Sequence, residues 1–545
     1  MDMKNKRVCG VAATFGVAAI LFFSTALAPG ATITLERKTI DSRKSDFRLR
    51  SESPDWMFRL SDEQSFHLNF TPQTVVKDGK ETREWQANED DATRDAFKKV
   101  VKKEPAKYHS EFPLRGVATL GDRKYGFVLD APDAKTPGYG LLYLDRNGNG
   151  DLTDDEVIES DAVRQAREKA NDAKQSTDEK QDKVREAAAD MLAAAGQHSA
   201  EFPRIDLTIE IDGKKVEHPL FFTCHSYQTN DYAYAAASVC GGVYYEGQID
   251  IDGRSRRVVL VDYNNNGRFD DPSTVNAVQY GPNQPARRYV TRGDVLYVDP
   301  QPVTDFNLIW DPAGLDFRHS VEKMICLDGK YQDLKVSPTG ETLTLEPSKV
   351  PLGLVTSPNA NYRAVLHGDR GVVAIKGTKD EAVALPVGEW KLVSYVIDLT
   401  DVKPADEPKP EKKPAADAKK KGGLWSALGK ALGETAGESP LVSGTMPGQR
   451  RTTMVAASAV DSCPAVKVAA GETVVLPFGP PFTTTATISH YDPRRDTLYL
   501  EMEIADSTGA LVTNMSINGG RPGKPKIKIT DPDGKTVIEG DFEYG

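Results

Sequence analysis

The feature that most constrains this chain is a twelve-residue stretch, residues 145–156, whose oxygen-bearing side chains follow the spacing of a calcium-binding loop. We call it loop one. Its candidate ligands are Asp145, Asn147, Asn149, Asp151, Thr153 and Glu156. Gly150 permits the sharp turn at the sixth position, Asp151 offers a main-chain carbonyl at the seventh, Thr153 can hold a bridging water, and Glu156 closes the shell with a bidentate carboxylate. The spacing therefore predicts calcium as a cofactor.

A second stretch, residues 262–273, repeats the first nine positions of this pattern and is called loop two. Its candidate metal-site residues are Asp262, Asn264, Asn266, Arg268 and Asp270. Gly267 occupies the sixth position, as Gly150 does in loop one. The twelfth residue is Ser273, which has no carboxylate. We therefore expect loop two to bind calcium more weakly than loop one.

Both loops resemble the EF-hand loop of calcium-binding proteins and the related loop of dockerins, over these two short segments alone. An EF-hand loop follows a helix, whereas the aliphatic runs at 140–144 and 257–261 predict strands. The loops are therefore expected to be strand-borne, and the opening of a helix pair is not implied. The alternative is that Asp, Asn and Gly form metal-free turns here, because Asx side chains bond their own backbone.

The two loops are expected to end two related β units. Residues 116–121 lead through a strand to loop one, and the similar residues 247–253 lead through a strand to loop two. An internal repeat is the simplest explanation of this pattern.

The N-terminus predicts export. Basic residues at Lys4, Lys6 and Arg7 precede an apolar run from Val8 to Ala28, which is typical of a secretory signal. The run is also long enough to remain as a single membrane anchor. We expect a periplasmic, cell-surface or secreted protein.

The exported part contains four cysteines, an even number in an oxidising compartment. This favours disulfide bonds between Cys224 and Cys240, as neighbours on a hairpin, and between Cys326 and Cys463. Four free buried thiols are the alternative.

Helices are predicted in two places. Residues 90–103 place Ala92, Ala96, Phe97 and Val100 on one face, and residues 160–196 are rich in Ala, Lys and Glu with a mainly alanine face. The second segment is expected to form a long helical insertion, either as a solvated spacer or as an arm that binds a partner.

The fold class is predicted as mainly β, a multi-domain β-sandwich type with this helical insertion and a disordered excursion. The predicted divisions are a signal peptide or anchor at 1–31, a β unit with loop one at 45–159, the helical insertion at 160–199, a β unit with loop two at 200–288, a β-sandwich region at 289–401, a linker at 402–447 and a C-terminal β region at 448–545.

The C-terminal part resembles two sandwich families. Residues 384–392 resemble the turn and strand of carboxypeptidase-regulatory-like sandwiches, and residues 525–538 form a hairpin pattern that would suit the last strands of an immunoglobulin-like sandwich. The linker at 402–447 is rich in Pro, Lys, Ala and Gly, a composition that cannot bury a core. Within it, residues 423–433 could form a short Trp-bearing amphipathic helix that contacts a membrane surface or its own domain.

Charge and motifs limit the function. The net charge of −11 argues against nucleic acid as a partner. The sequence contains no Gly-x-Ser-x-Gly elbow, zinc helix or phosphate-binding loop. These observations favour a non-catalytic, exported calcium-binding protein with a scaffold, adhesion or envelope-associated role, whose partner is an envelope protein or a glycan. The alternative is a secreted hydrolase acting on carbohydrate or peptide.

Overall fold

The computed structural model describes most of the chain. The described residues are 30–40, 49–50, 57–58, 64–77, 80–133, 138–172, 197–229, 232–279, 284–300, 317–400, 452–493 and 497–542. Within these ranges strands dominate and the helices are α1 (Asp91–Val100) and α2 (Asp161–Asp172). The prediction of a mainly β chain is confirmed. The apolar run at 8–28, the linker at 402–447 and the segment 423–433 lie outside the described residues.

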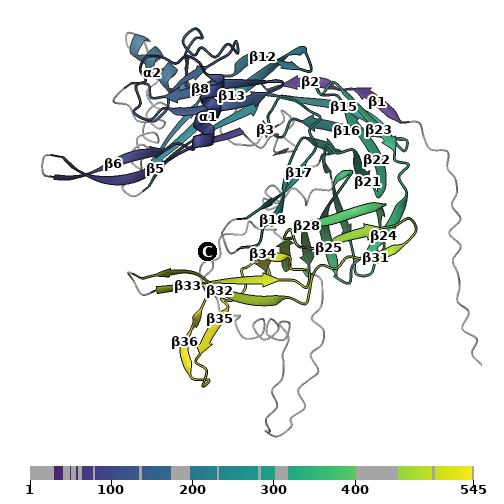
Figure 1. Cartoon of the computed structure of the whole chain (residues 1–545). Helices are drawn as coiled ribbons and strands as arrows, with labels where there is room; N and C mark the ends of the chain where they lie inside the picture. Colours follow the sequence, from purple (N-terminus) through teal and green to yellow (C-terminus); the bar gives the residue numbers. More distant parts are fainter. Residues whose placement is uncertain are drawn as a thin grey trace, which may run out of the picture.

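The first β body contains two sheets that pack face to face (Figure 1). One has the order β10-β9-β8-β7 and the other β11-β13-β14-β5-β6, with β12 paired to β13. Their bounds are β5 Gln64–Lys77, β6 Lys80–Asn88, β7 Leu114–Leu120, β8 Arg123–Asp130, β9 Leu141–Leu144, β10 Ile158–Glu159, β11 Gln197–Glu201, β12 Ile205–Ile211, β13 Lys214–Gln228 and β14 Ala233–Gly241. The ring centroids of Phe127 and Phe222 lie 5.3 Å apart between the sheets. Burial alternates along β12, because successive side chains of a strand point to opposite faces. The apolar residues of β12 therefore all face this core.

The second body carries loop two. Its sheets have the orders β2-β15-β16-β19-β20 and β1-β23-β22-β21. Their bounds are β1 Ala31–Thr34, β2 Glu36–Thr39, β15 Val243–Ile251, β16 Arg254–Val261, β19 Val295–Val298, β20 Arg318–Ser320, β21 Met324–Leu327, β22 Lys330–Val336 and β23 Thr342–Pro347. Leu35, between the two N-terminal strands, is buried in the core that these sheets share. The strands β1 and β2 therefore join the two sheets, one strand to each.

The third body surrounds Trp390, whose indole N–H donates to the carbonyl of Pro386 at 2.8 Å. Its main sheet has the order β26-β25-β28-β29-β34-β33-β32, with β30 paired to β28, and its smaller sheet has the order β27-β24-β31. Their bounds are β24 Leu352–Thr356, β25 Asn361–Gly368, β26 Gly371–Gly377, β27 Val383–Pro386, β28 Gly388–Asp398, β29 Met454–Ser458, β30 Ala465–Val468, β31 Thr473–Val475, β32 Thr483–Asp492, β33 Thr497–Ala505 and β34 Leu511–Ser516. The regions at 289–401 and 448–545 thus share one sheet, through the pairing of β28 with β29.

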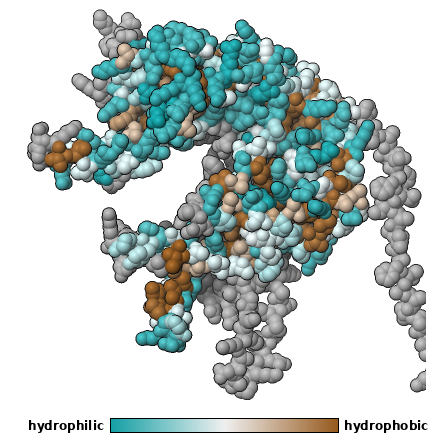
Figure 2. Space-filling view, in the orientation of Figure 1, coloured by the Kyte–Doolittle hydropathy of each residue, from teal (hydrophilic) through white to brown (hydrophobic). Residues whose placement is uncertain are grey.

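Separate two-stranded sheets accompany these bodies, and the pair β35-β36 projects from the third one (Figure 1). They are β3 Leu49–Arg50 with β4 Met57–Phe58, β17 Thr274–Val278 with β18 Arg287–Thr291, and β35 Lys526–Thr530 with β36 Thr536–Asp541. The predicted hairpin at 525–538 is confirmed, but it stands apart from the main sheet. Figure 2 shows a hydrophobic patch there, consistent with the exposure of Val537 and Ile538.

The predicted helix at 90–103 is confirmed as α1. Its N-cap is Asp90, whose carboxylate accepts from the main-chain N–H of Thr93, and Phe97 is buried. The second helix, α2, confirms only the beginning of the predicted insertion at 160–196, since residues 173–196 lie outside the described part. None of the described helices is long and apolar enough to cross a membrane.

The predicted disulfides were wrong, because Cys224, Cys240, Cys326 and Cys463 form no disulfide bond. Cys224 and Cys240 do lie on paired strands, but Cys224 faces Ala237 while Cys240 faces Phe221 across the ladder. This register separates the two thiols by three residue positions along the strands. Cys463 instead directs its sulfur toward the carbonyl of Thr508 at 3.4 Å.

Candidate metal centres

Both predicted loops begin where a buried strand ends, as the sequence indicated. Loop one follows β9 and loop two follows β16. Gly150 and Gly267 have φ angles of 82° and 85°, a backbone conformation that favours glycine. The tight turn at the sixth position is therefore present in both.

In loop one, the first residue organises the turn. The carboxylate of Asp145 accepts from the main-chain N–H groups of Asn149 at 3.0 Å and Gly150 at 2.9 Å. The side-chain amide of Asn149 donates to Asp154 at 2.7 Å, and that of Asn147 lies 3.4 Å from the same carboxylate. Asp154, which is not among the predicted ligands, therefore faces the side chains of positions three and five.

The remaining candidates of loop one point elsewhere. Asp151 pairs with Lys103 at 2.7 Å and accepts from the hydroxyl of Thr153 at 2.6 Å. The hydrogen bond from Lys103, with those from Thr153, lowers the pKa of Asp151 to about 2. Glu156 is exposed, and among the described residues no hydrogen bond or ion pair joins it to the loop. The geometry thus gives no support to Glu156 as the closing ligand.

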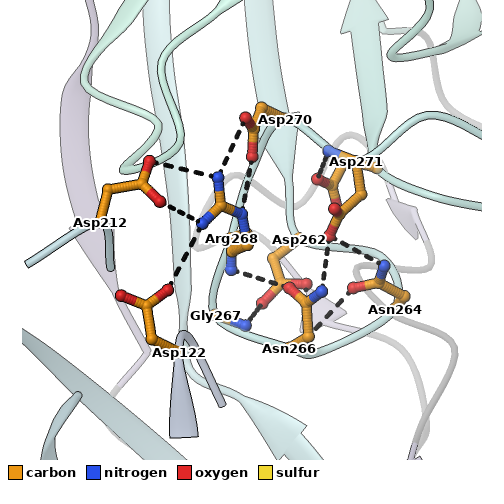
Figure 3. Close-up of polar contacts among 10 residues, drawn as sticks. Asp122, Asp212, Asp262, Asn264, Asn266, Gly267, Arg268, Asp270 and Asp271 are labelled. Atoms are coloured by element: carbon orange, nitrogen blue, oxygen red, sulfur yellow. Dashed lines mark hydrogen bonds and ion pairs between the residues drawn. The ribbon is translucent and has the colours of Figure 1, made fainter. Parts of the chain in front are cut away.

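Loop two repeats this arrangement with greater burial (Figure 3). The carboxylate of Asp262 accepts from the main-chain N–H groups of Asn266 at 3.1 Å and Gly267 at 2.6 Å. The side-chain amides of Asn264 and Asn266 donate to Asp271 at 3.1 and 2.6 Å. Asp271 is the tenth residue of loop two, as Asp154 is of loop one. A carboxylate at the tenth position is therefore common to both loops, although neither Asp154 nor Asp271 is among the predicted ligands.

A third carboxylate reaches loop two from a distant part of the chain. Asp294 is fully buried and accepts from the main-chain N–H groups of Tyr263 at 3.1 Å and Asp271 at 2.8 Å. It immediately precedes β19, where Val295 pairs with Val261, so Asp294 lies beside Asp262. No local sequence signal could have found it, because the strand pairing alone brings it to the loop.

The corresponding place beside loop one holds a glycine. There Leu144 pairs with Phe127 on β8, so Gly126 lies next to Asp145, and its carbonyl accepts from the main-chain N–H of Asp145 at 3.0 Å. Loop one therefore lacks the neighbouring-strand carboxylate that loop two has.

Two candidates of loop two have a different role. The guanidinium of Arg268 pairs with Asp212 at 2.9 Å and with Asp270 at 3.1 Å, and lies 3.7 Å from Asp122 (Figure 3). Asp122 and Asp212 belong to turns of the first β body. The side chains of Arg268 and Asp270 thus connect two bodies rather than pointing toward Asp262.

Two carboxyl groups at loop two, those of Asp262 and Asp294, have raised pKa values. Burial, assisted by the nearby charge of Asp271, raises the pKa of Asp262 to about 7, although main-chain hydrogen bonds oppose this shift. Burial and the neighbouring charge of Asp262 likewise raise the pKa of Asp294 well above its usual value. Within the described part of the chain, no ion pair joins Asp262, Asp271 or Asp294 to a Lys or Arg. Buried carboxylates without a cation are costly, so this set suits a divalent cation.

The arrangement of the side chains is that of a turn rather than a finished coordination shell. Among the described residues, no three His, Cys, Asp or Glu side chains stand together in a way that would hold a metal ion. A cation here would also need amide and main-chain oxygens, which calcium accepts. The turn alternative explains the hydrogen bonds from the backbone, but a turn does not require the buried carboxylate of Asp294 beside Asp262.

Comparison with known proteins identifies no relative: no family model, no curated protein and no solved structure matches this chain.

Proposed function

We propose that this chain is an exported, non-catalytic β protein whose two strand-borne loops bind calcium. The observation that carries the proposal is the juxtaposition of Asp262, Asp271 and Asp294, two of them fully or almost fully buried, with no cation partner among the described residues. Calcium takes six to eight oxygen ligands, and carboxylates with side-chain amide oxygens are its usual donors.

The structure leads us to reverse the affinity order expected from sequence. That order rested on Glu156, which is exposed, against Ser273. Loop two has the additional carboxylate of Asp294, whereas loop one has Gly126 at that place. We therefore propose that loop two is the tighter site. Ligand charge count is one of the properties that set calcium affinity.

Calcium at loop two would stiffen the junction between two β bodies. The loop that holds Asp262 also holds Arg268, which pairs with Asp212 on the turn between β12 and β13. Fixing the loop backbone would fix the position of this guanidinium. A scaffold role follows from such a rigid connection, and the two-sheet cores of the bodies are consistent with the proposed sandwich character.

We propose that the binding role is adhesion to a glycan. An uncharged aromatic surface on β13 and β14 supports this proposal. On the outer side of β13 and β14, Tyr227 pairs across the ladder with Tyr234, and Tyr232 lies 5.6 Å from Tyr234 between ring centroids. His225 is beside them and bonds the hydroxyl of Ser199 at 2.9 Å. Aromatic rings with hydroxyl and amide groups suit the apolar face and the hydroxyl groups of a sugar.

The other proposals have less support. A hydrolase acting on carbohydrate or peptide would need two convergent carboxylates or a histidine-based set in a pocket. A cavity of about 610 Å³ between the second and third β bodies has Asp328 as its acidic lining residue, and this residue pairs with Arg256. Membrane contact through residues 423–433 stays a proposal based on sequence.

Calorimetric titration of calcium into metal-free protein tests the proposal. We expect two sites, the weaker with an affinity near 10⁻⁴ M, the order found in extracellular modules. Asp294→Asn should remove the tighter site, whereas the matched control Asp250→Asn, on an exposed position of β15, should leave both. Absence of calcium binding to the unmodified protein would contradict the proposal, as would an unchanged tighter site in Asp294→Asn.

A further inference from the structure

The larger sheet of the first β body carries a row of side chains that crosses four strands. Tyr227 on β13 pairs with Tyr234 on β14. Tyr234 in turn pairs with Asn69 on β5, and Asn69 with Asn88 on β6. We call these four residues the outer row, because the alternate positions of their strands, such as Leu68, face the core. Three strand spacings of about 4.8 Å make the outer row roughly 14 Å long, which exceeds one sugar ring.

At one end of the outer row, four rings form an aromatic cluster. The ring centroid of Tyr234 lies 6.0 Å from that of Tyr227, 5.6 Å from that of Tyr232 and 5.8 Å from that of His225. Tyr232 is 53% exposed, so this cluster presents ring surface to solvent. Grouped apolar surface of this kind marks a contact site for a ligand or partner. The electron-rich face of such a ring can stack against the C–H groups of a sugar.

The other end of the outer row carries carboxamide groups. Asn88 donates from Nδ2 to the hydroxyl of Thr71 at 2.5 Å, and the side chain of Asn69 forms no hydrogen bond with other described residues. A carboxamide offers two N–H donors and an oxygen with two lone pairs. Because Asn69 and Asn88 are both exposed, most of these groups are open to the hydroxyl groups of a sugar.

The outer row and the row beside it contain no Asp, Glu, Lys or Arg. The neighbouring row consists, in ladder order, of Ser199, His225, Ala236 and His67. In the whole chain, 27% of the residues are Asp, Glu, Lys or Arg. A surface without these residues offers no ion pair to an acidic or basic ligand, so its composition favours an uncharged one.

An extended peptide suits this face less well than a sugar chain does. Peptides that bind to a sheet in extended form add as a strand at its edge. The strand β14 is paired on both sides, with β13 and β5, so its main-chain groups are already used. A ligand of the outer row must therefore bind through ring faces, amides and hydroxyl groups.

We propose that this surface binds an uncharged oligosaccharide in extended form, lying across β13, β14, β5 and β6. One sugar ring stacks on the cluster around Tyr234, and another ring of the same chain forms hydrogen bonds with Asn69 and Asn88. This inference rests on the proposed adhesion to a glycan, and it adds the charge of that glycan and its course across the sheet. No residue of the outer row belongs to either calcium loop, so binding should not require calcium.

Calorimetry on the full-length chain, with and without calcium, tests this site. The probes are cellohexaose and chitohexaose, with glucose, N-acetylglucosamine and the acidic hexagalacturonate as references. A proline-rich peptide tests the alternative occupant. We expect at least one neutral hexasaccharide to bind at least about tenfold more tightly than its monosaccharide, because only the longer chain reaches both ends of the outer row. Hexagalacturonate should bind at least about tenfold more weakly than that hexasaccharide, since no cation of the outer row compensates its carboxylates.

Variants locate the binding to the outer row. Tyr234→Ala should weaken binding of the hexasaccharide at least about tenfold. Asn88→Ala should weaken it at least about threefold and leave the monosaccharide unaffected, because it removes hydrogen bonds at the far end alone. The matched control Tyr499→Ala removes an exposed tyrosine of β33 and should change binding less than about twofold. Thermal unfolding verifies that each variant is folded, and the exposed Asn88 serves if Tyr234→Ala is not.

The outcomes separate this inference from the proposed function. Equal binding of the hexasaccharide and its monosaccharide would overturn the extended course and leave adhesion to a glycan in place, and so would an unchanged hexasaccharide affinity in folded Asn88→Ala. Binding of the peptide alone, or of no neutral sugar, would overturn both the inference and the adhesion. The calcium sites depend only on their own titration.

Discussion

Arg268 and Asp212 form an ion pair of 2.9 Å across 56 residues of sequence, and they join loop two to the turn between β12 and β13. The guanidinium is mostly shielded, and Asp122 lies 3.7 Å from it on a second turn. One side chain of a proposed metal loop thus connects two β bodies.

Replacing this side chain should loosen the junction. We expect Arg268→Met to lower the free energy of unfolding by about 1 kcal/mol, the upper range for a partly exposed ion pair. Denaturant unfolding measures the change. The exposed control Arg254→Met should lie within about 0.5 kcal/mol of the unmodified protein. Equal stability of the two variants would show that the connection contributes nothing.

The stability of metal-free protein should fall as the pH rises from about 4 to about 7. The folded-state pKa of Asp262 is raised to about 7, so its protonated form is favoured in the folded protein. The resulting stability is complete below the unfolded pKa and is lost as the pH passes the folded pKa, by about 4 kcal/mol for one such group. Thermal unfolding across this range measures the loss.

Calcium and Asp294→Asn should each reduce this pH dependence. Saturating calcium stabilises the ionised carboxylates, and Asp294→Asn removes a second carboxyl group whose pKa is raised by burial and by the charge of Asp262. Above pH 7 the metal-free Asp294→Asn protein should therefore be more stable than the unmodified one. A steeper loss of stability in the variant would contradict this explanation.

Loop one should depend on Asp154 rather than on Glu156. Asp154 accepts from the side-chain amides of Asn147 and Asn149, whereas no hydrogen bond joins Glu156 to the loop among the described residues. We expect Asp154→Asn to weaken calcium binding at loop one at least about tenfold, and Glu156→Gln to change it less than threefold. Calorimetry in an Asp294→Asn background isolates this loop. The opposite order would restore the ligand set expected from the sequence.

All four cysteines of the described chain should label as free thiols in denaturant without prior reduction. In native protein, Cys326 should react before Cys224. Burial raises the pKa of the Cys224 thiol to about 12, and the thiolate is the reactive form. Mass spectrometry after timed alkylation gives the order. Two labels fewer in unreduced than in reduced samples would reveal a disulfide.

Local sequence signals predicted the local structure well. Alternating or aliphatic runs located β9 and β16, and the Asp90 cap with the spacing of Phe97 located α1. Glycines at the sixth position identified both turns. These features depend on residues within about a dozen positions of one another, so a single sequence is enough to predict them.

The errors arose where the register of distant strands decides the contact. Asp294 lies beside Asp262 only because β19 pairs with β16. In the register of β13 with β14, Cys224 and Cys240 are three positions apart, so the two thiols do not meet. The partner of Arg268 likewise comes from another body. Neither composition nor spacing encodes these pairings.

The ladder between β28 and β29 has a practical consequence. The main-chain N–H of Leu399 donates to the carbonyl of Thr453 at 2.8 Å, so the chain departs from this sheet and re-enters it at neighbouring positions. A guest domain whose own termini lie close together could be inserted into the intervening sequence without separating these strands. The protein thereby offers an internal position for a fluorescent reporter, one that leaves both chain ends unmodified for surface display or immobilisation.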